Sequence, residues 1–123
     1  MNDRLFVLLG ALSGFLSVAA GAFGAHALKP RLSEYALGIF ETGARYQMFH
    51  ALALVAVGIL AARGDSRALA AAGWLFVAGT ALFSGSLYAL ALSGVKVLGA
   101  ITPLGGLCFL GGWLALAAWA AGR

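Results

Sequence analysis

The sequence has few charged residues, a single cysteine and only two prolines. Charged residues make up 10% of the 123 positions and hydrophobic residues 63%, and the mean hydropathy is +0.98. A water-soluble domain of this length needs charges along the outer face of each element, whereas here they gather at a few places between long uncharged runs. The composition therefore excludes an ordinary soluble domain and predicts a membrane protein.

Residue patterns that carry known chemistry are also missing. Cys108 has no second thiol with which to form a disulfide or a zinc or iron–sulfur site. There is no nucleophile elbow, phosphate-binding loop or pair of catalytic carboxylates. The net charge of +4 is spread over loops without the basic cluster of a nucleic-acid site. We therefore expect no enzyme activity, metal, cofactor or nucleic-acid partner.

Four hydrophobic runs are long enough to cross a bilayer, which takes roughly 20 apolar residues. They cover about residues 5–28, 44–62, 68–93 and 97–121. Short polar or flexible segments connect them, so the runs use nearly the whole chain. We predict one transmembrane domain over residues 1–123, an all-α integral membrane four-helix bundle with up-down-up-down topology.

The second run is preceded by an amphipathic extension. Pro30 ends the first helix, and Ser33 can cap the next one. From about residue 33 to 44 the pattern is amphipathic, which predicts an interfacial start to a long helix that then enters the bilayer. The basic residues favour a cytoplasmic N-terminus by about one charge. They are Arg4, Arg63, Arg67 and Arg123 on one side and Lys29, Arg31 and Lys96 on the other.

Small residues recur at helical spacing in three of the runs. Because helices in lipid gain little from burying apolar side chains against each other, close approach through small residues supports their association. The predicted helix-packing positions are Gly10, Gly14, Gly21, Gly79, Gly105 and Gly112. The same stripes leave a homo-oligomer and a membrane-protein partner as open alternatives, beside contact with membrane lipids.

Polar side chains of all four runs fall in one half of the bilayer when they are placed by a helical rise of about 1.5 Å per residue. We call this set the polar layer, and it contains His26, Glu41, Arg45, Tyr46, Gln47, His50, Ser84, Ser86, Tyr88 and Thr102. Glu41 and Arg45 are four residues apart, as are Tyr46 and His50, so each pair shares a helix face. A charge at the bilayer centre costs about 2.5–3.5 kcal/mol on insertion scales, which favours pairing of Arg45 with Glu41.

Two interpretations of the polar layer stay open. In the first, Glu41 and Arg45 form an interfacial ion pair, the histidines make structural hydrogen bonds, and the protein is a small accessory or scaffold subunit. In the second, the protein has a binding or transport role, and the polar layer lines a wet cavity for a proton, an anionic lipid head group or a quinone-like molecule. The lining residues would be His26, Glu41, Arg45, Tyr46 and His50. A lipid-modifying enzyme that uses Ser84 or Ser86 is a third interpretation, although no spacing marks a nucleophile with its base.

Four sequence blocks, one in each run, resemble a known family. They are GAFGAHAL (Gly21 to Leu28), TGARYQMFHALAL (Thr42 to Leu54), LFSGSLYALALSG (Leu82 to Gly94) and LGAITPLGGLCFLGGW (Leu98 to Trp113). Their combination resembles the small four-span membrane proteins of unknown function, YgdD-like and transmembrane protein 256-like, that carry domain of unknown function 423. The resemblance implies a four-helix integral membrane protein and supplies no activity or substrate. We expect the protein to be a multi-pass protein of a bacterial cytoplasmic (inner) membrane. The family's recurrent polar positions match every residue of the polar layer except Glu41. They also match Pro103.

Overall fold

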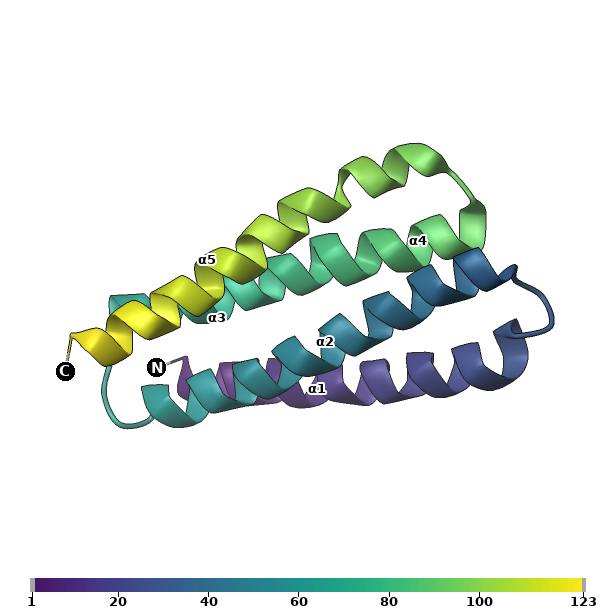
Figure 1. The fold of residues 1–123 in the computed structure, drawn as a ribbon. Coiled ribbons are helices and arrows are strands. Elements are labelled where there is room, and N and C mark those ends of the chain that lie inside the picture. Colours follow the sequence, from purple (N-terminus) through teal and green to yellow (C-terminus); the bar gives the residue numbers. More distant parts are fainter. Residues whose placement is uncertain (1, 123) are drawn as a thin grey trace.

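The computed structural model describes residues 2–122, and this part of the chain folds into helices and short connections without a strand (Figure 1). Helix α1 (Asp3–Phe23) continues into a π-helical turn, η1 (Gly24–Leu28), and α2 covers Glu34–Ala61. The third span joins α3 (Arg67–Gly79), a π-helical turn η2 (Thr80–Ser84) and α4 (Gly85–Ser93). A 3₁₀ turn, η3 (Lys96–Ala100), leads into α5 (Thr102–Ala121).

These elements make four apolar helical spans of 26, 28, 27 and 26 residues within the described chain. At about 1.5 Å per residue each span is about 40 Å long, more than the roughly 30 Å hydrocarbon core of a bilayer. The predicted all-α membrane bundle is therefore confirmed. Helix α2 is continuous from Glu34, so the amphipathic extension and the second span form one helix.

The helix ends follow the local chemistry of the sequence. Ser33 accepts a hydrogen bond from the Ala36 amide at 3.1 Å and caps α2, and Ser66 does the same for the Leu69 amide at 3.3 Å at the start of α3. Gly94 ends α4 with a φ of 73°, a left-handed conformation that favours glycine. Pro103 lies in the first turn of α5, where its missing N–H costs no helical hydrogen bond. These signals fix the starts of α2, α3 and α5 and the end of α4.

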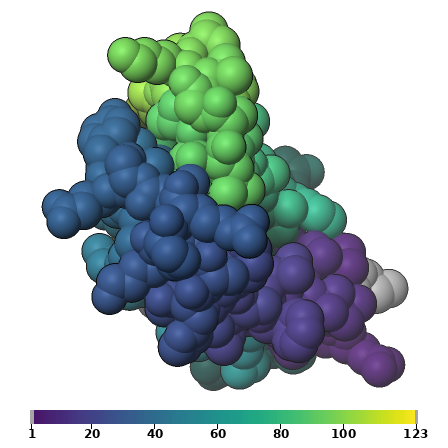
Figure 2. All heavy atoms as spheres, turned by 90° about the vertical axis from the view of Figure 1, so that its right-hand side faces the viewer, coloured from purple at the N-terminus to yellow at the C-terminus, as the bar shows by residue number. Residues whose placement is uncertain are grey.

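The four spans are arranged as two antiparallel hairpins (Figure 1). Helix α1 packs along α2, and α5 packs along α3 and η2, while α2 also contacts α3, η2 and α4 and so joins the hairpins. Figure 2 views the bundle from the end opposite the two chain ends, where the blue connection before α2 lies beside the green connection after α4. Leu28, Phe40 and Ala91 form a small apolar cluster at this end.

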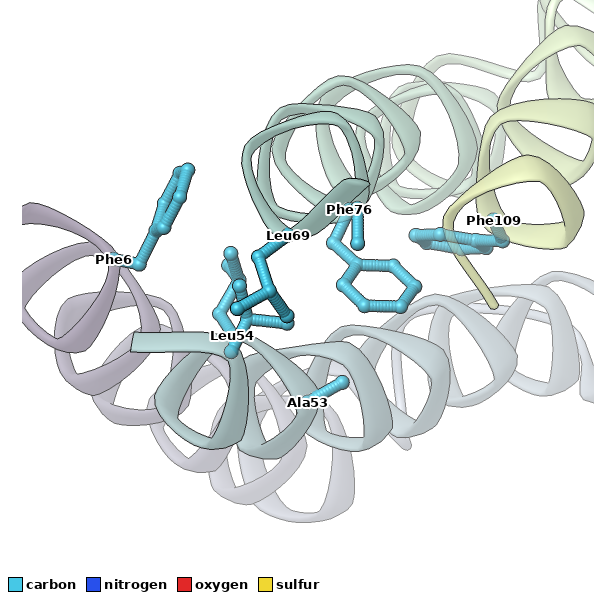
Figure 3. Packing of buried hydrophobic residues seen from close by; sticks show 8 residues of the cluster. Phe6, Ala53, Leu54, Leu69, Phe76 and Phe109 are labelled. Carbon is cyan, nitrogen blue, oxygen red and sulfur yellow. The ribbon is translucent and has the colours of Figure 1, made fainter. Parts of the chain in front are cut away.

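The main apolar core draws side chains from all four spans (Figure 3). Phe6 from α1 and Phe76 from α3 are fully buried, and they meet Leu54 from α2 and Phe109 from α5 in one cluster. Phe6 occupies the space left by Gly73, and Phe76 occupies that left by Gly112. Large aromatic side chains are therefore matched to glycines on the facing helix.

Most of the predicted packing glycines lie at close helix contacts. A Cβ added at Gly10 would lie 2.8 Å from the Ala51 carbonyl oxygen, and one added at Gly105 would collide with the backbone of Phe83. Gly79 faces Phe109, whereas Gly14 has ordinary contact at 3.8 Å with the Ala51 Cβ. The prediction for Gly21 is wrong, because nothing lies within 4 Å of an added Cβ and the position therefore does not face a close helix contact.

Candidate functional site

His50 lies at the centre of an aromatic cluster between α2 and α5. Its side chain is 4% exposed and stacks on Phe109 with ring centroids 3.5 Å apart and an interplanar angle of 7°. The Nδ1 atom is 2.7 Å from the Tyr46 carbonyl oxygen, and the Trp113 indole donates to Nε2 at 3.0 Å. Because a carbonyl only accepts and an indole N–H only donates, these contacts define a neutral imidazole with its proton on Nδ1.

Gln47 connects three helices through its side-chain amide. The Tyr88 hydroxyl on α4 donates to Gln47 Oε1 at 2.6 Å, and Gln47 Nε2 donates to the Ser13 hydroxyl on α1 at 3.2 Å. Gln47 itself is 6% exposed on α2. Both ends of the amide are therefore used inside the bundle.

Three serines make further bonds between helices. Ser17 on α1 donates to the Ala44 carbonyl and Ser84 on η2 donates to the Gly43 carbonyl, each at 2.7 Å. The Ser86 hydroxyl on α4 is 2.6 Å from the Thr102 hydroxyl at the start of α5. We call the complete hydrogen-bonded set the polar lock, which consists of Ser13, Ser17, Gln47, His50, Ser84, Ser86, Tyr88, Thr102 and Trp113.

The ionisable members at the interfacial end of the polar layer lie apart from the polar lock. His26, Glu41 and Arg45 are exposed, and the residues 2–122 include no ion pair between Glu41 and Arg45. The predicted pairing of these two is therefore wrong in this structure. The physical reason is that both side chains are exposed, and an exposed ion pair is little more stable than its two charges solvated separately. Tyr46 is 38% exposed and packs on Phe83.

Three residues of the polar lock are absent from the predicted polar layer. Ser13 and Ser17 look like small packing residues in an apolar helix, although their spacing of four places both on one face. Trp113 lies one to two turns inside its span, deeper than an interfacial tryptophan, but depth alone does not distinguish a lipid contact from a helix contact. The sequence signal that could have found these residues is a side-chain polar atom that lies too deep in the membrane to reach water.

A groove with a volume of about 530 Å³ runs between α2 and α5 beside this cluster. Its lining is almost entirely apolar, since His50 and Trp113 present carbon faces while their nitrogens bond to each other and to backbone. The main lining residues are Tyr46, His50, Phe83, Pro103, Phe109 and Trp113. Chemically, this groove suits a hydrocarbon chain or ring and offers no free donor or acceptor from the imidazole.

One buried hydroxyl is left over. Thr80 Oγ1, in η2, is the buried side-chain polar atom without a hydrogen-bond partner in the described part of the chain. It borders a smaller groove of about 250 Å³ that Ser13 and Gln47 also line. Groups of three or more histidine, cysteine, aspartate or glutamate side chains that could hold a metal do not occur among residues 2–122.

Comparison with known proteins identifies relatives over most of the chain. The family model described as "Protein of unknown function (DUF423)" matches residues 20–106, a range that contains the whole predicted polar layer. A UPF0382 membrane protein of Staphylococcus aureus is 47% identical over 100 residues, which cover 81% of each chain. The UPF0382 membrane protein YwdK of Bacillus subtilis is 45% identical over 101 residues, covering 81% of this chain and 82% of the relative.

No solved structure matches the chain significantly. The family match spans well over half of the sequence, and the bacterial relatives that share its length are named membrane proteins. Together with the four apolar spans, these findings establish that the chain is a multi-pass integral membrane protein and belongs to the DUF423 family of proteins of unknown function.

Proposed function

We propose that this protein is a non-enzymatic accessory or scaffold protein of the membrane, whose polar lock serves to hold the four helices in one arrangement. The observation that carries this proposal is that the buried polar side chains bond to other groups of the bundle. Gln47 and His50 each use both ends of their polar groups inside the bundle. A binding site for a polar substrate would instead direct some of these atoms into a cavity.

The serines support the same conclusion. A nucleophilic serine needs a base within hydrogen-bond reach. Ser84 donates to the Gly43 carbonyl, and Ser86 is paired with Thr102, so neither hydroxyl contacts an imidazole or carboxylate. His50, the buried histidine, faces the Trp113 indole and the Tyr46 carbonyl. This arrangement favours structure over acid–base catalysis.

The strength of the polar lock is suited to a structural role. Six of its hydrogen bonds join different spans: Ser17–Ala44, Gln47–Ser13, Ser84–Gly43, Ser86–Thr102, Tyr88–Gln47 and Trp113–His50. Side-chain hydrogen bonds between membrane helices contribute about 0.6 kcal/mol each on average, so six contribute about 4 kcal/mol. This energy fixes the rotation of each helix, while the glycine contacts set the distances.

A second candidate function is the binding of a hydrophobic ligand in the groove between α2 and α5. The specific observation in its favour is the size and lining of the groove, which lies in the range of about 300–1,000 Å³ typical of small-molecule pockets and has aromatic walls. A quinone-like ring or an acyl chain matches such walls. Proton transfer through His50 has less support, because both of its nitrogens are engaged.

Native mass spectrometry of the full chain, extracted from its own membrane in mild detergent, distinguishes the two functions. The matched variants are Leu107→Trp, which fills the groove, and Leu114→Trp, on the same helix outside it; both side chains are highly exposed. The scaffold proposal expects added mass from another protein chain, retained in both variants. A small hydrophobic ligand present in the parent and in Leu114→Trp but absent from Leu107→Trp would overturn it in favour of ligand binding.

A further inference from the structure

A second apolar groove lies nearer the end of the bundle at which α1 begins. It has a volume of about 540 Å³ and runs between the beginning of α1 and the end of α2. Gly58 brings these helices together, because a Cβ there would lie 2.7 Å from the Asp3 carbonyl oxygen and 2.9 Å from the Val7 amide nitrogen. Beside this contact, the larger side chains diverge and leave a trough whose walls include Val7, Leu8, Ala11, Ile59 and Ala62.

Arg4 lines the mouth of this trough. It lies in the first turn of α1, where a membrane-spanning helix passes from water into lipid, and it is exposed. Within residues 2–122 its guanidinium has no hydrogen-bond or ion-pair partner. Arg63 directly follows the trough residue Ala62 and adds a second positive charge at this end, and the acidic residue Asp3 also lines the trough.

We propose that this trough binds an anionic phospholipid, with the phosphate on Arg4 and one acyl chain along Val7, Leu8 and Ile59. A guanidinium binds phosphate oxygens through two parallel N–H donors, so the free Arg4 side chain supplies the polar half of the site. The apolar walls supply the other half, because they continue from the charged mouth toward the bilayer interior. A trough of this kind matches a molecule that has an anionic head and a hydrocarbon tail.

The charge distribution of the chain agrees with this occupant. Arg4, Arg63 and Arg67 lie at the end of the bundle that the basic residues favour as cytoplasmic. The cytoplasmic leaflet has a negative surface potential from its anionic lipids, and basic residues near that surface attract them. This proposal does not depend on the proposed scaffold function, since it concerns other residues at the other membrane surface.

The test is a native mass spectrometry titration of the full chain in mild detergent with phosphatidylglycerol and with phosphatidylcholine of identical acyl chains. The parent should bind the first phosphatidylglycerol molecule more tightly than phosphatidylcholine. Arg4→Gln should reduce this preference about fivefold, the effect of one cation near an anionic surface. Lys96→Gln, which removes one charge at the opposite end, should leave it unchanged.

Two more variants test the trough. Ala11→Phe fills it and should weaken the binding of both lipids, whereas Ala22→Phe adds the same ring to an exposed position of α1 outside the trough and should not. Thermal unfolding of each variant checks that it is folded, and if Ala11→Phe unfolds, Arg4→Gln alone decides. Glycerol phosphate, the head group without chains, should not compete.

Three results would overturn the proposal. Equal binding of phosphatidylglycerol and phosphatidylcholine by the parent would exclude an anionic-lipid site. An equal loss of preference in Arg4→Gln and Lys96→Gln would indicate only net charge. Competition by glycerol phosphate would assign the site to a free phosphate compound. None of these results bears on the partner protein expected of a scaffold, so the two proposals fail separately.

Discussion

Replacing Gly105 by alanine should destabilise the bundle, because the added Cβ has no space between α5 and η2. It would collide with the backbone nitrogen of Phe83 and lie 2.7 Å from both the Cα and the Cβ of the same residue. Backbone atoms cannot turn aside as the end of a flexible side chain can. The collision is therefore relieved only if α5 moves away from the third span.

The size of the effect follows from two opposing contributions. Overpacking of a well-packed interior typically costs about 1–3 kcal/mol. Alanine in place of glycine inside a helix offsets this by up to about 1 kcal/mol. Gly21→Ala is the matched control, because an added Cβ meets nothing within 4 Å and only the favourable contribution remains. The two variants should differ in free energy of unfolding by about 1–3 kcal/mol, with Gly105→Ala the less stable.

Reversible unfolding in mixed micelles of mild detergent and dodecyl sulfate, followed by tryptophan fluorescence and circular dichroism, measures this difference. The same titration on the parent gives the reference. If Gly105→Ala were as stable as Gly21→Ala, the close approach of α5 to η2 would not exist in the folded protein, and the argument from this glycine contact would be refuted.

Three further substitutions test the buried polar groups in the same assay: two change the polar lock, and one changes the unpaired Thr80. Gln47→Leu removes two bonds between helices and leaves the Tyr88 hydroxyl without its acceptor, so it should cost at least about 1 kcal/mol; an unchanged midpoint would contradict the network. Trp113→Phe keeps an aromatic ring but removes the donor to His50 Nε2 and should cost about 1 kcal/mol; an unfolding midpoint equal to that of the parent would contradict this hydrogen bond. Thr80→Val removes a buried hydroxyl that has no partner and should leave stability equal or raised; a loss above about 1 kcal/mol would show that this hydroxyl is bonded in the membrane.

The sequence predicts the fold because a bilayer permits so few solutions. Backbone groups in hydrocarbon must bond within their own helix, so four runs of sufficient length imply four helices. Local chemistry then marks their ends, as at Ser33 and Gly94. What remains after this step is only the arrangement of the helices around one another.

The candidate site is harder to predict, because sequence gives depth in the membrane but not which helix face meets which neighbour. Gln47 and His50 turn inward and bond to other spans, while Arg45 at similar depth is exposed on the same helix. The close contacts at Gly58 and Gly73 were also missed, since they depend on Val7 and Phe6 lying opposite. To predict which face of a helix turns inward, one must know which helices pack together, and the sequence of a single span does not give this.

The π-helical turn η2 links the number of residues in the third span to the direction in which the side chains of α4 project. A π-helical turn holds one more residue than an α-helical turn, so it changes the direction in which all later side chains project. Rewinding residues 80–84 into regular α-helix, with no residue removed, would shift the later residues by about one position and rotate α4 by up to about 100° relative to α3. Ser86 and Tyr88 would then point away from Thr102 and Gln47. Homologous chains that keep this network are therefore expected either to retain the π-helical turn or to be one residue shorter in this segment.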